Sequence, residues 1–145
     1  DGSTAIERLE PLLALDPDDA QGARFVLVNR LLREGDDAAA LERIGAVDDS
    51  PFPEFAFGAV LALTRMGRIR EAEAAFRTAH ARLPKVLGYL RRSRKPPASL
   101  RPGVMTLGGE DQAWLYGEAM GDLFRAEKGL IPFMDRLAKR MKQGL

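Results

Sequence analysis

The stretch FVLVNRLLREGDDAAALERI, at residues 25–44, is matched 32 positions later by FGAVLALTRMGRIREAEAAF, at residues 57–76. The matched pairs share residue type or apolar character, and all lie at this one offset: Phe25 with Phe57, Leu31 with Leu63, Arg33 with Arg65, Gly35 with Gly67, Ala40 with Ala72 and Ile44 with Phe76. Several matches at a single offset indicate an internal repeat, and a repeat of this length is typical of stacked helix pairs.

Each copy of the repeat is expected to form two helices around its glycine. Gly35 and Gly67 stand where a helix must end in a left-handed residue, a conformation that glycine adopts without steric cost. The residues after Gly67 then step by three and four along one apolar stripe: Ile69, Ala72, Phe76, Ala79 and Leu83. Pro84 marks the end of this helix, and Ser50 before Pro51 resembles a helix start.

The rest of the chain also predicts helices. The opening residues fit half a repeat, with Ala5, Leu9 and Leu12 on one face. A short helix is expected at residues 86–90, and a last pair at about 110–125 and 131–142. No segment shows the alternation of a strand. We therefore predict an all-α chain of about seven helices, divided into repeats at 1–84, a basic connecting segment at 85–109 and a C-terminal helix pair at 110–145 that packs on the same stack.

The second repeat resembles the tetratricopeptide repeat (TPR), whose signature after the inter-helix turn it matches with Gly67, Ala72, Phe76, Ala79 and Pro84. The first repeat matches with Gly35, Ala40 and Ile44 and departs at Val47. The resemblance covers residues 3–84 and implies an antiparallel helix-pair stack, a fragment of an α-solenoid. A less extensive similarity, at residues 21–32 and 109–118, is to bacterial and plant relatives of the suppressor-of-tumorigenicity-seven proteins.

The TPR resemblance implies a protein-protein interaction module that binds a protein or peptide on its concave face. The first helix of each pair lines that face in the family, which here gives the candidate partner-binding residues Phe25, Asn29, Arg33, Phe57, Leu61 and Arg65. Paired arginines would suit an acidic partner. The carboxylate-clamp pattern of some members is incomplete, because Phe25 and Gly58 stand where a lysine and an asparagine would be. The alternative is that the aromatic residues are core and the arginines are solvated.

Composition argues against catalysis. The chain has no cysteine and a single histidine, His80, so thiolate nucleophiles and the usual cysteine or two-histidine metal sites are excluded. No nucleophile-elbow or phosphate-loop motif occurs, and Glu118 with Asp122 lacks a third metal ligand. We expect no enzymatic activity, no cofactor and no metal, a surface position for His80, and core positions for Trp114, Leu115, Tyr116, Met120 and Phe124. No apolar run is long enough for a membrane span, and a cytoplasmic protein is the default expectation.

The charge distribution leaves two alternatives open. Residues 1–54 carry 13 acidic and 5 basic side chains, whereas residues 55–145 carry 8 acidic and 17 basic ones. Self-assembly into a homo-oligomer through these oppositely charged ends is one alternative. The other is a nucleic-acid contact through the basic patch Arg91, Arg92, Arg94 and Lys95. Only Tyr89 is interleaved with that patch, so a solvated loop, or one bound to an acidic partner, is favoured over nucleic acid.

Overall fold

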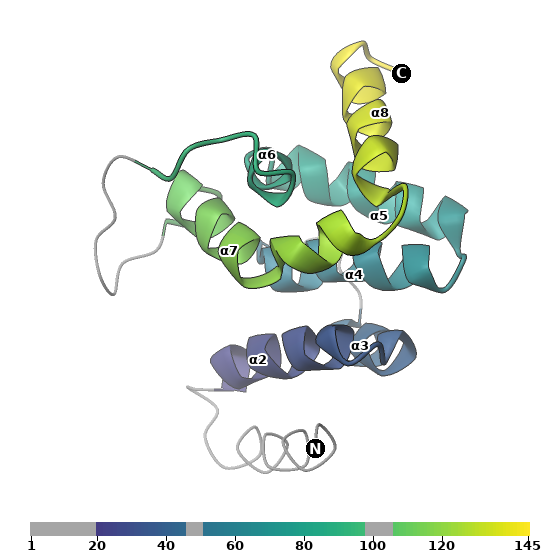
Figure 1. Cartoon of the computed structure of the whole chain (residues 1–145), viewed down its shortest axis with the longest axis vertical. Coiled ribbons are helices and arrows are strands. Elements are labelled where there is room, and N and C mark those ends of the chain that lie inside the picture. The colour runs from purple at the N-terminus through teal and green to yellow at the C-terminus, as the bar shows by residue number, and fades with distance from the viewer. Residues whose placement is uncertain (1–19, 46–50, 98–105) are drawn as a thin grey trace.

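A computed structural model describes residues 20–45, 51–97 and 106–145 of the chain. These ranges contain helices and no strand, which confirms the all-α prediction. The helices are α2 (Ala20–Arg33), α3 (Asp37–Ile44), α4 (Pro53–Arg65), α5 (Ile69–Arg82), α6 (Val86–Leu90), α7 (Glu110–Ala126) and α8 (Leu130–Lys142). In the described part of the chain, α2 and α3 lie toward one end of the long axis, α4, α5, α6 and α7 lie in the middle, and α8 extends at the other end (Figure 1). The expected opening helix around Ala5, Leu9 and Leu12 lies outside the described residues.

The turns after α2 and α4 are built identically, as the repeat predicts. Gly35 has a φ of 80° and Gly67 a φ of 76°, both in the left-handed region. The amide of Gly35 donates to Leu32 (3.1 Å), and the next amide donates to Leu31 (2.8 Å). The amide of Gly67 and the one after it make the equivalent bonds, of 3.0 and 2.9 Å. Both turns are therefore Schellman motifs, in which glycine satisfies the last carbonyls of the helix.

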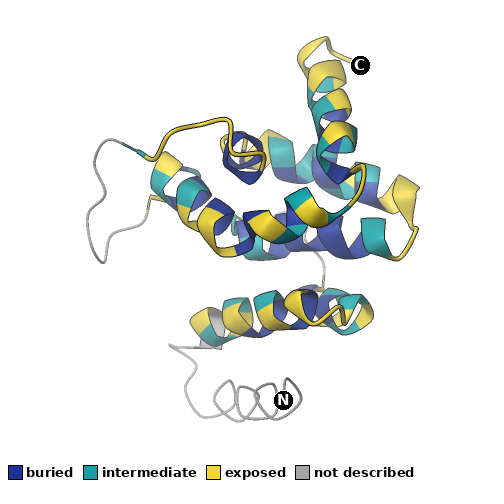
Figure 2. Cartoon of the chain, viewed as in Figure 1, coloured by how far each residue is buried: buried dark blue, intermediate teal, exposed yellow. Residues whose placement is uncertain are grey.

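Helix α4 is at the centre of the core. It packs against α2, α3, α5 and α7, and every residue from Phe55 to Leu63 is buried (Figure 2). Gly58 permits a close crossing, since a Cβ there would lie 3.3 Å from the Leu32 side chain. A helix with so many neighbours needs apolar residues on all sides, which explains why its sequence is hydrophobic throughout.

Two helix starts differ from the sequence predictions. Helix α4 begins at Pro53 with Phe52 as its N-cap, two residues later than the Ser50–Pro51 signature suggested. A second proline is present, and Pro53 occupies the first helical turn, where its missing amide costs nothing. Ser50 itself is outside the described residues. Ile69, expected in the apolar stripe of α5, is 49% exposed because it is the first residue of the helix, whereas Ala72, Phe76, Ala79 and Leu83 are buried as expected.

Helices α6, α7 and α8 pack on one another and on the repeat region. The predicted helices at 86–90, 110–125 and 131–142 are confirmed to within one residue. Gly117 of α7 lies so close to α6 that a Cβ would be 2.9 Å from the Cβ of Tyr89. Arg125, two turns along the same face of α7, donates to the carbonyl of Leu90 (2.8 Å) and caps the end of α6. Helix α7 also packs on α4, and α8 packs on α5.

Candidate binding groove

The residues predicted to line a concave binding face do not form an open surface. Phe57 and Leu61 are fully buried, at 0% exposure. Phe25 is partly buried in an aromatic cluster, with its ring centroid 5.0 Å from that of Phe52 and 5.1 Å from that of Phe55. The two buried side chains thus belong to the core and are not available to a partner, because α4 is enclosed by its neighbours.

Arg33 and Arg65, the two predicted binding arginines, are engaged within the chain. Arg33 donates to both carboxylate oxygens of Asp122 (2.8 and 3.0 Å) and to the carbonyl of Ala119 (2.9 Å). These hydrogen bonds raise the pKa of Arg33 and lower that of Asp122. The same ion pair occupies Asp122, which the sequence had offered with Glu118 as a metal ligand. Within the described residues, no cluster of acidic or histidine side chains is suited to a metal ion.

Arg65 makes a more buried set of contacts. Its Nη1 donates to the carbonyl of Leu32 (2.7 Å) and to Asp37 (3.1 Å), and its Nε lies 3.7 Å from Glu127. Arg65 therefore joins the ends of α2, α4 and α7. The two recurring arginines hold helices together in this structure, and they do so with different partners.

The basic patch is held in a defined shape. Arg91 forms an ion pair with Asp135 of α8 and donates to the Ser93 hydroxyl (2.9 Å). Arg94 lies 3.4 Å from Glu110 and over the ring of Tyr89, 5.9 Å from its centroid. Arg92 and Lys95 are exposed, and neither forms an ion pair with the described part of the chain.

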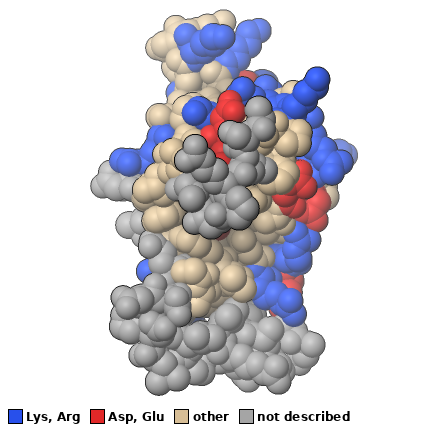
Figure 3. Space-filling view, turned by 90° about the vertical axis from the view of Figure 1, so that its left-hand side faces the viewer, with Lys and Arg blue, Asp and Glu red and all other residues tan. Residues whose placement is uncertain are grey.

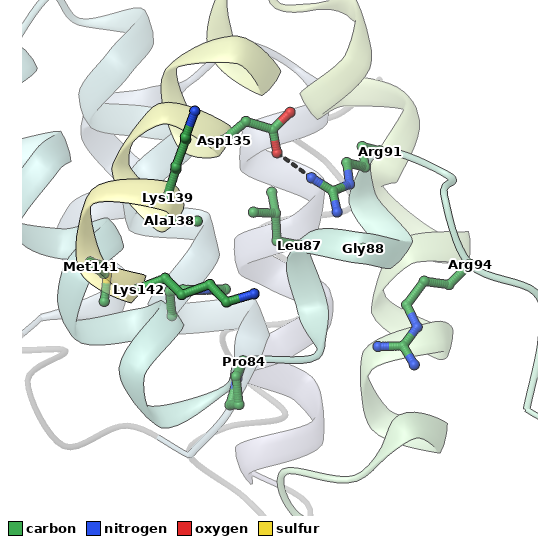
Figure 4. Close-up of a pocket in the computed structure, with 11 residues that line it drawn as sticks. Pro84, Leu87, Gly88, Arg91, Arg94, Asp135, Ala138, Lys139, Met141 and Lys142 are labelled. Atoms are coloured by element: carbon green, nitrogen blue, oxygen red, sulfur yellow. Dashed lines mark hydrogen bonds and ion pairs between the residues drawn. The ribbon is translucent and has the colours of Figure 1, made fainter. Parts of the chain in front are cut away.

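An open groove of about 560 Å³ runs between the end of α5, α6 and α8 (Figure 4). Its apolar surface comes from small and aliphatic residues: Pro84, Leu87, Gly88, Ala138 and Met141. Its charged lining comes from two separate parts of the chain: Arg91 and Arg94 after α6, and Asp135, Lys139 and Lys142 on α8. Lys142 points from α8 toward the middle of the groove, and Arg94 reaches toward it from the opposite side (Figure 4).

The groove carries an excess of positive charge. Four cations line it against one carboxylate, Asp135. Arg91 already pairs with that carboxylate, and Arg94 lies 3.4 Å from Glu110, which is outside the lining. Lys139 and Lys142 are exposed and form no ion pair within the described ranges. Several Lys and Arg side chains lie at the α8 end of the molecule (Figure 3). A groove of this kind favours an anionic ligand with some apolar surface, because the cations attract its negative charge and the apolar lining buries its apolar part.

His80 is half-buried on the wall of this groove, whereas the sequence suggested a surface position. Its ring stacks on Phe76 at 5.1 Å, and its Nδ1 is buried with no hydrogen-bond partner in the described structure. Burial lowers the pKa of His80, and the charge of Arg91 lowers it further. His80 therefore contributes a neutral ring to the groove near pH 7, in addition to the four cations.

A buried carboxyl lies outside the groove, where α4 approaches α7. Burial raises the pKa of Glu54 to about 7, and the charge of Glu54 adds to the burial that raises the pKa of Tyr116. Glu54 Oε2 and the Tyr116 hydroxyl oxygen are both buried without a hydrogen-bond partner in the described structure. An unpaired carboxyl and an unpaired hydroxyl in the interior make the stability of the fold sensitive to the protonation of Glu54.

Sequence reasoning missed the lysines of α8. Lys139 and Lys142 are three residues apart and share a helix face, and that spacing is visible in the sequence. Their relation to Arg91 and Arg94 is not, because it depends on how α8 packs on α5. Trp114 was expected in the core and is only partly buried, and Leu115 is exposed, whereas Tyr116, Met120 and Phe124 are buried as expected.

Comparisons with protein families, with curated proteins and with solved structures find no match to this chain. None of the described helices combines the length and the hydrophobicity that crossing a membrane requires. The function must therefore be argued from the geometry of the groove and from the helix arrangement.

Proposed function

We propose that this chain is a helical-repeat module of the TPR type that binds an acidic segment of another protein in the groove between α5, α6 and α8. The observation that carries the proposal is the charge of that groove, in which four cations face one carboxylate above an apolar floor. The module binds its partner and does not transform it. An arginine fork and flexible lysines suit the carboxylates of a peptide, since both make charge-assisted hydrogen bonds with them.

The helix arrangement supports the repeat part of this proposal. Contacts run from α2 to α3, from α3 to α4, from α2 to α4 and from α4 to α5, the order expected where one helix pair stacks on the next. The identical glycine turns after α2 and α4 add a second, local argument.

The groove is favoured over the face predicted from the family because two of its four cations, Lys139 and Lys142, are exposed and unpaired within the described residues. Phe57 and Leu61 are core, and Arg33 and Arg65 are occupied by carboxylates of the chain itself. Lys139 and Lys142 have no such partner in the described ranges. An incoming carboxylate would therefore form new ion pairs at the groove without breaking existing ones.

Binding of a fluorescein-labelled peptide of glutamates, followed by anisotropy, tests the proposal. We expect the double variant Lys139→Glu, Lys142→Glu to weaken binding at least about tenfold, because two attractions become repulsions in a partly enclosed site. The matched control is Arg70→Glu with Lys128→Glu, which changes the net charge equally at exposed positions outside the groove. Equal loss in both variants would show that only the overall charge matters and would contradict a specific groove.

Sedimentation of the chain alone separates this proposal from self-assembly. The acidic residues of a second copy are the alternative occupant, given the charge asymmetry of the sequence. We expect a monomer at low and at high salt. An oligomer that dissociates as salt rises, and that Lys139→Glu with Lys142→Glu abolishes, would instead assign the groove to a second copy.

A further inference from the structure

A second, smaller pocket lies on the other side of Arg94. It has a volume of about 320 Å³ and is lined by Tyr89, Arg92, Arg94, Lys95, Pro96, Trp114, Gly117 and Glu118. Arg94 also lines the first groove, so one guanidinium stands between the two. The first groove is rich in cations over small aliphatic residues, whereas this second pocket, which we call the tryptophan pocket, contains two aromatic side chains and a proline.

Arg94 is fixed in this dividing position by a glycine. A Cβ on Gly88 would lie 2.6 Å from Cδ and 2.9 Å from Cγ of Arg94, so the aliphatic stem of Arg94 crosses α6 directly over Gly88. The backbone of the loop is tied down as well, since the Ser93 amide donates to Gly88 at 2.9 Å and the Ser93 hydroxyl donates to the same carbonyl at 3.1 Å. The wall between the two hollows is thus built into the fold.

Arg92 is held in a strained conformation at the same place. It is the one described non-glycine residue with a positive φ, 60°, and its turn makes the same pair of backbone bonds as the glycine turns after α2 and α4. A left-handed arginine costs about 1 kcal/mol or more relative to glycine. Strain of this kind concentrates at functional sites, where the contribution of the side chain to function outweighs the free-energy cost of the strained backbone.

The lining of the tryptophan pocket indicates an apolar occupant. Trp114 is partly buried and partly exposed, and with Pro96 it offers apolar surface to a ligand. Glu118 is exposed and forms no ion pair within the described residues, so it disfavours a second carboxylate there. Arg92 and Lys95, which also line the pocket, attract acidic residues of the ligand that flank its apolar side chain.

From this geometry we infer that the groove and the tryptophan pocket form one continuous binding site, which binds an acidic segment carrying a bulky apolar side chain. The carboxylates lie in the groove, along Lys139, Lys142 and Arg94, and the apolar side chain lies against Trp114. This inference rests on the proposed function and adds a sequence requirement to the partner. Nucleic acid fits less well, because Tyr89 is buried and Trp114 is the one partly exposed aromatic of the pocket, whereas single strands need successive stacking surfaces.

The fluorescence of Trp114 tests the inference directly, because it is the single tryptophan of the chain. Two labelled peptides of equal length and charge are compared, one with a central leucine among glutamates and one with a central glycine. We expect the leucine peptide to bind about tenfold more tightly, since burying a leucine contributes somewhat more than this before the costs of ordering it are subtracted. We also expect only the leucine peptide to shift the emission of Trp114.

The outcomes separate the inference from the proposed function. Equal affinities, with anisotropy reporting binding and the emission of Trp114 unchanged, would overturn the tryptophan pocket and leave the acidic-peptide groove standing. Failure of both peptides to bind would overturn both. Binding of a single-stranded oligonucleotide with a shifted Trp114 emission, in the absence of peptide binding, would replace both with the nucleic-acid function.

A variant completes the test. Gly88→Ala should displace Arg94. Because Arg94 lines both the groove and the tryptophan pocket, the affinity for each peptide should fall by a similar factor, about threefold to fivefold. Trp114→Ala should remove the preference for leucine without weakening the glycine peptide. Thermal melts show whether each variant is folded, and the emission measurement on the unmodified chain stands whatever these variants do. A preference for leucine that survives Trp114→Ala would contradict the inference.

Discussion

Helices α2 and α4, in the repeat region α2–α5, end in the same hydrogen-bonded turn as α6, in the C-terminal region α6–α8, but the residue at the turn differs. Glycine occupies the left-handed position after α2 and α4, and arginine occupies it after α6. The arginines of the repeat region, Arg33 and Arg65, are bound to carboxylates of the chain. In the C-terminal region, Arg92, Lys95, Lys139 and Lys142 form no ion pair with the described residues. The arginines at the ends of α2 and α4 thus hold helices together, while these four C-terminal cations stay exposed, and one of them, Arg92, does so at a backbone cost.

The largest effect on the free energy of unfolding is expected from Glu54 of α4, which lies near Tyr116 of α7 where the two regions meet. Because its pKa is raised to about 7 from 4.5, the folded chain keeps a proton that the unfolded chain releases. The stability from this group is complete below pH 4.5 and falls as pH rises toward 7, by about 3 kcal/mol in all. Urea unfolding at pH 5 and pH 8 should show this loss in the unmodified chain and not in Glu54→Gln.

Glu118→Gln is the matched control for the pH experiment, since Glu118 is exposed and forms no ion pair with the described residues. It should leave the pH dependence unchanged. The lowered pKa of His80 acts in the opposite sense, because protonating that half-buried ring costs stability below its usual pKa. The difference between the unmodified chain and Glu54→Gln is therefore the quantity to examine, and identical pH profiles for the two would refute the role of Glu54.

Exchanging Arg65 and Arg91 for alanine compares the two regions directly. Arg65→Ala should cost about 2 kcal/mol, because it removes hydrogen bonds to a carbonyl and to a largely buried carboxylate. It should leave the affinity for the glutamate peptide unchanged. Arg91→Ala, whose ion pair is exposed, should cost less than about 1 kcal/mol and weaken the peptide. Chemical denaturation and anisotropy measure both quantities, and a peptide-binding defect in Arg65→Ala alone would reverse the assignment of the two regions.

Substitutions at the two left-handed turn residues, Gly67 and Arg92, should change the stability of the fold in opposite directions. Gly67→Ala should destabilise the fold by about 1 kcal/mol, because alanine is strained at a φ of 76°. Arg92→Gly should stabilise it by a similar amount, because glycine relieves the same strain. If Arg92→Gly also lowers the affinity for the leucine peptide, the arginine side chain contributes to binding and this contribution explains why the strained turn is kept. Melting curves that show Arg92→Gly to be the less stable protein would mean that the arginine stabilises the fold.

The smallest effect is expected at Arg33. Its ion pair with Asp122 links α2 to α7, but the side chains are 45% and 55% exposed, so Arg33→Ala should cost less than about 1 kcal/mol. The cost should shrink further in high salt, as screening weakens an exposed pair. Denaturation at low and high salt measures it. A cost as large as that of Arg65→Ala would show that both arginines are equal structural links, despite their different burial.

Much of the fold follows from local signals in the sequence. The glycines after α2 and α4 predict their own left-handed turns, and the spacing of Ala72, Phe76, Ala79 and Leu83 predicts the buried side of α5. The start of α4 was misplaced because two prolines compete for one helix start, and a proline pattern does not distinguish Pro51 from Pro53. The binding residues were harder to predict, since Phe57 and Leu61 are buried by helices that lie far away in the sequence.

The sequence by itself determined the helices, their glycine turns and which side of most helices is apolar, because these depend on residues within a few positions of one another. Tertiary structure alone decided the use of each charge. Arg33 and Arg65 recur at one offset and share a residue type, yet Asp122 and Asp37 neutralise them because α7 and α3 happen to pack beside them. Arg94 and Lys142 line one groove because α6 and α8 meet at the end of α5. Coulomb energy depends on separation in space, and only the packing of the helices sets that separation.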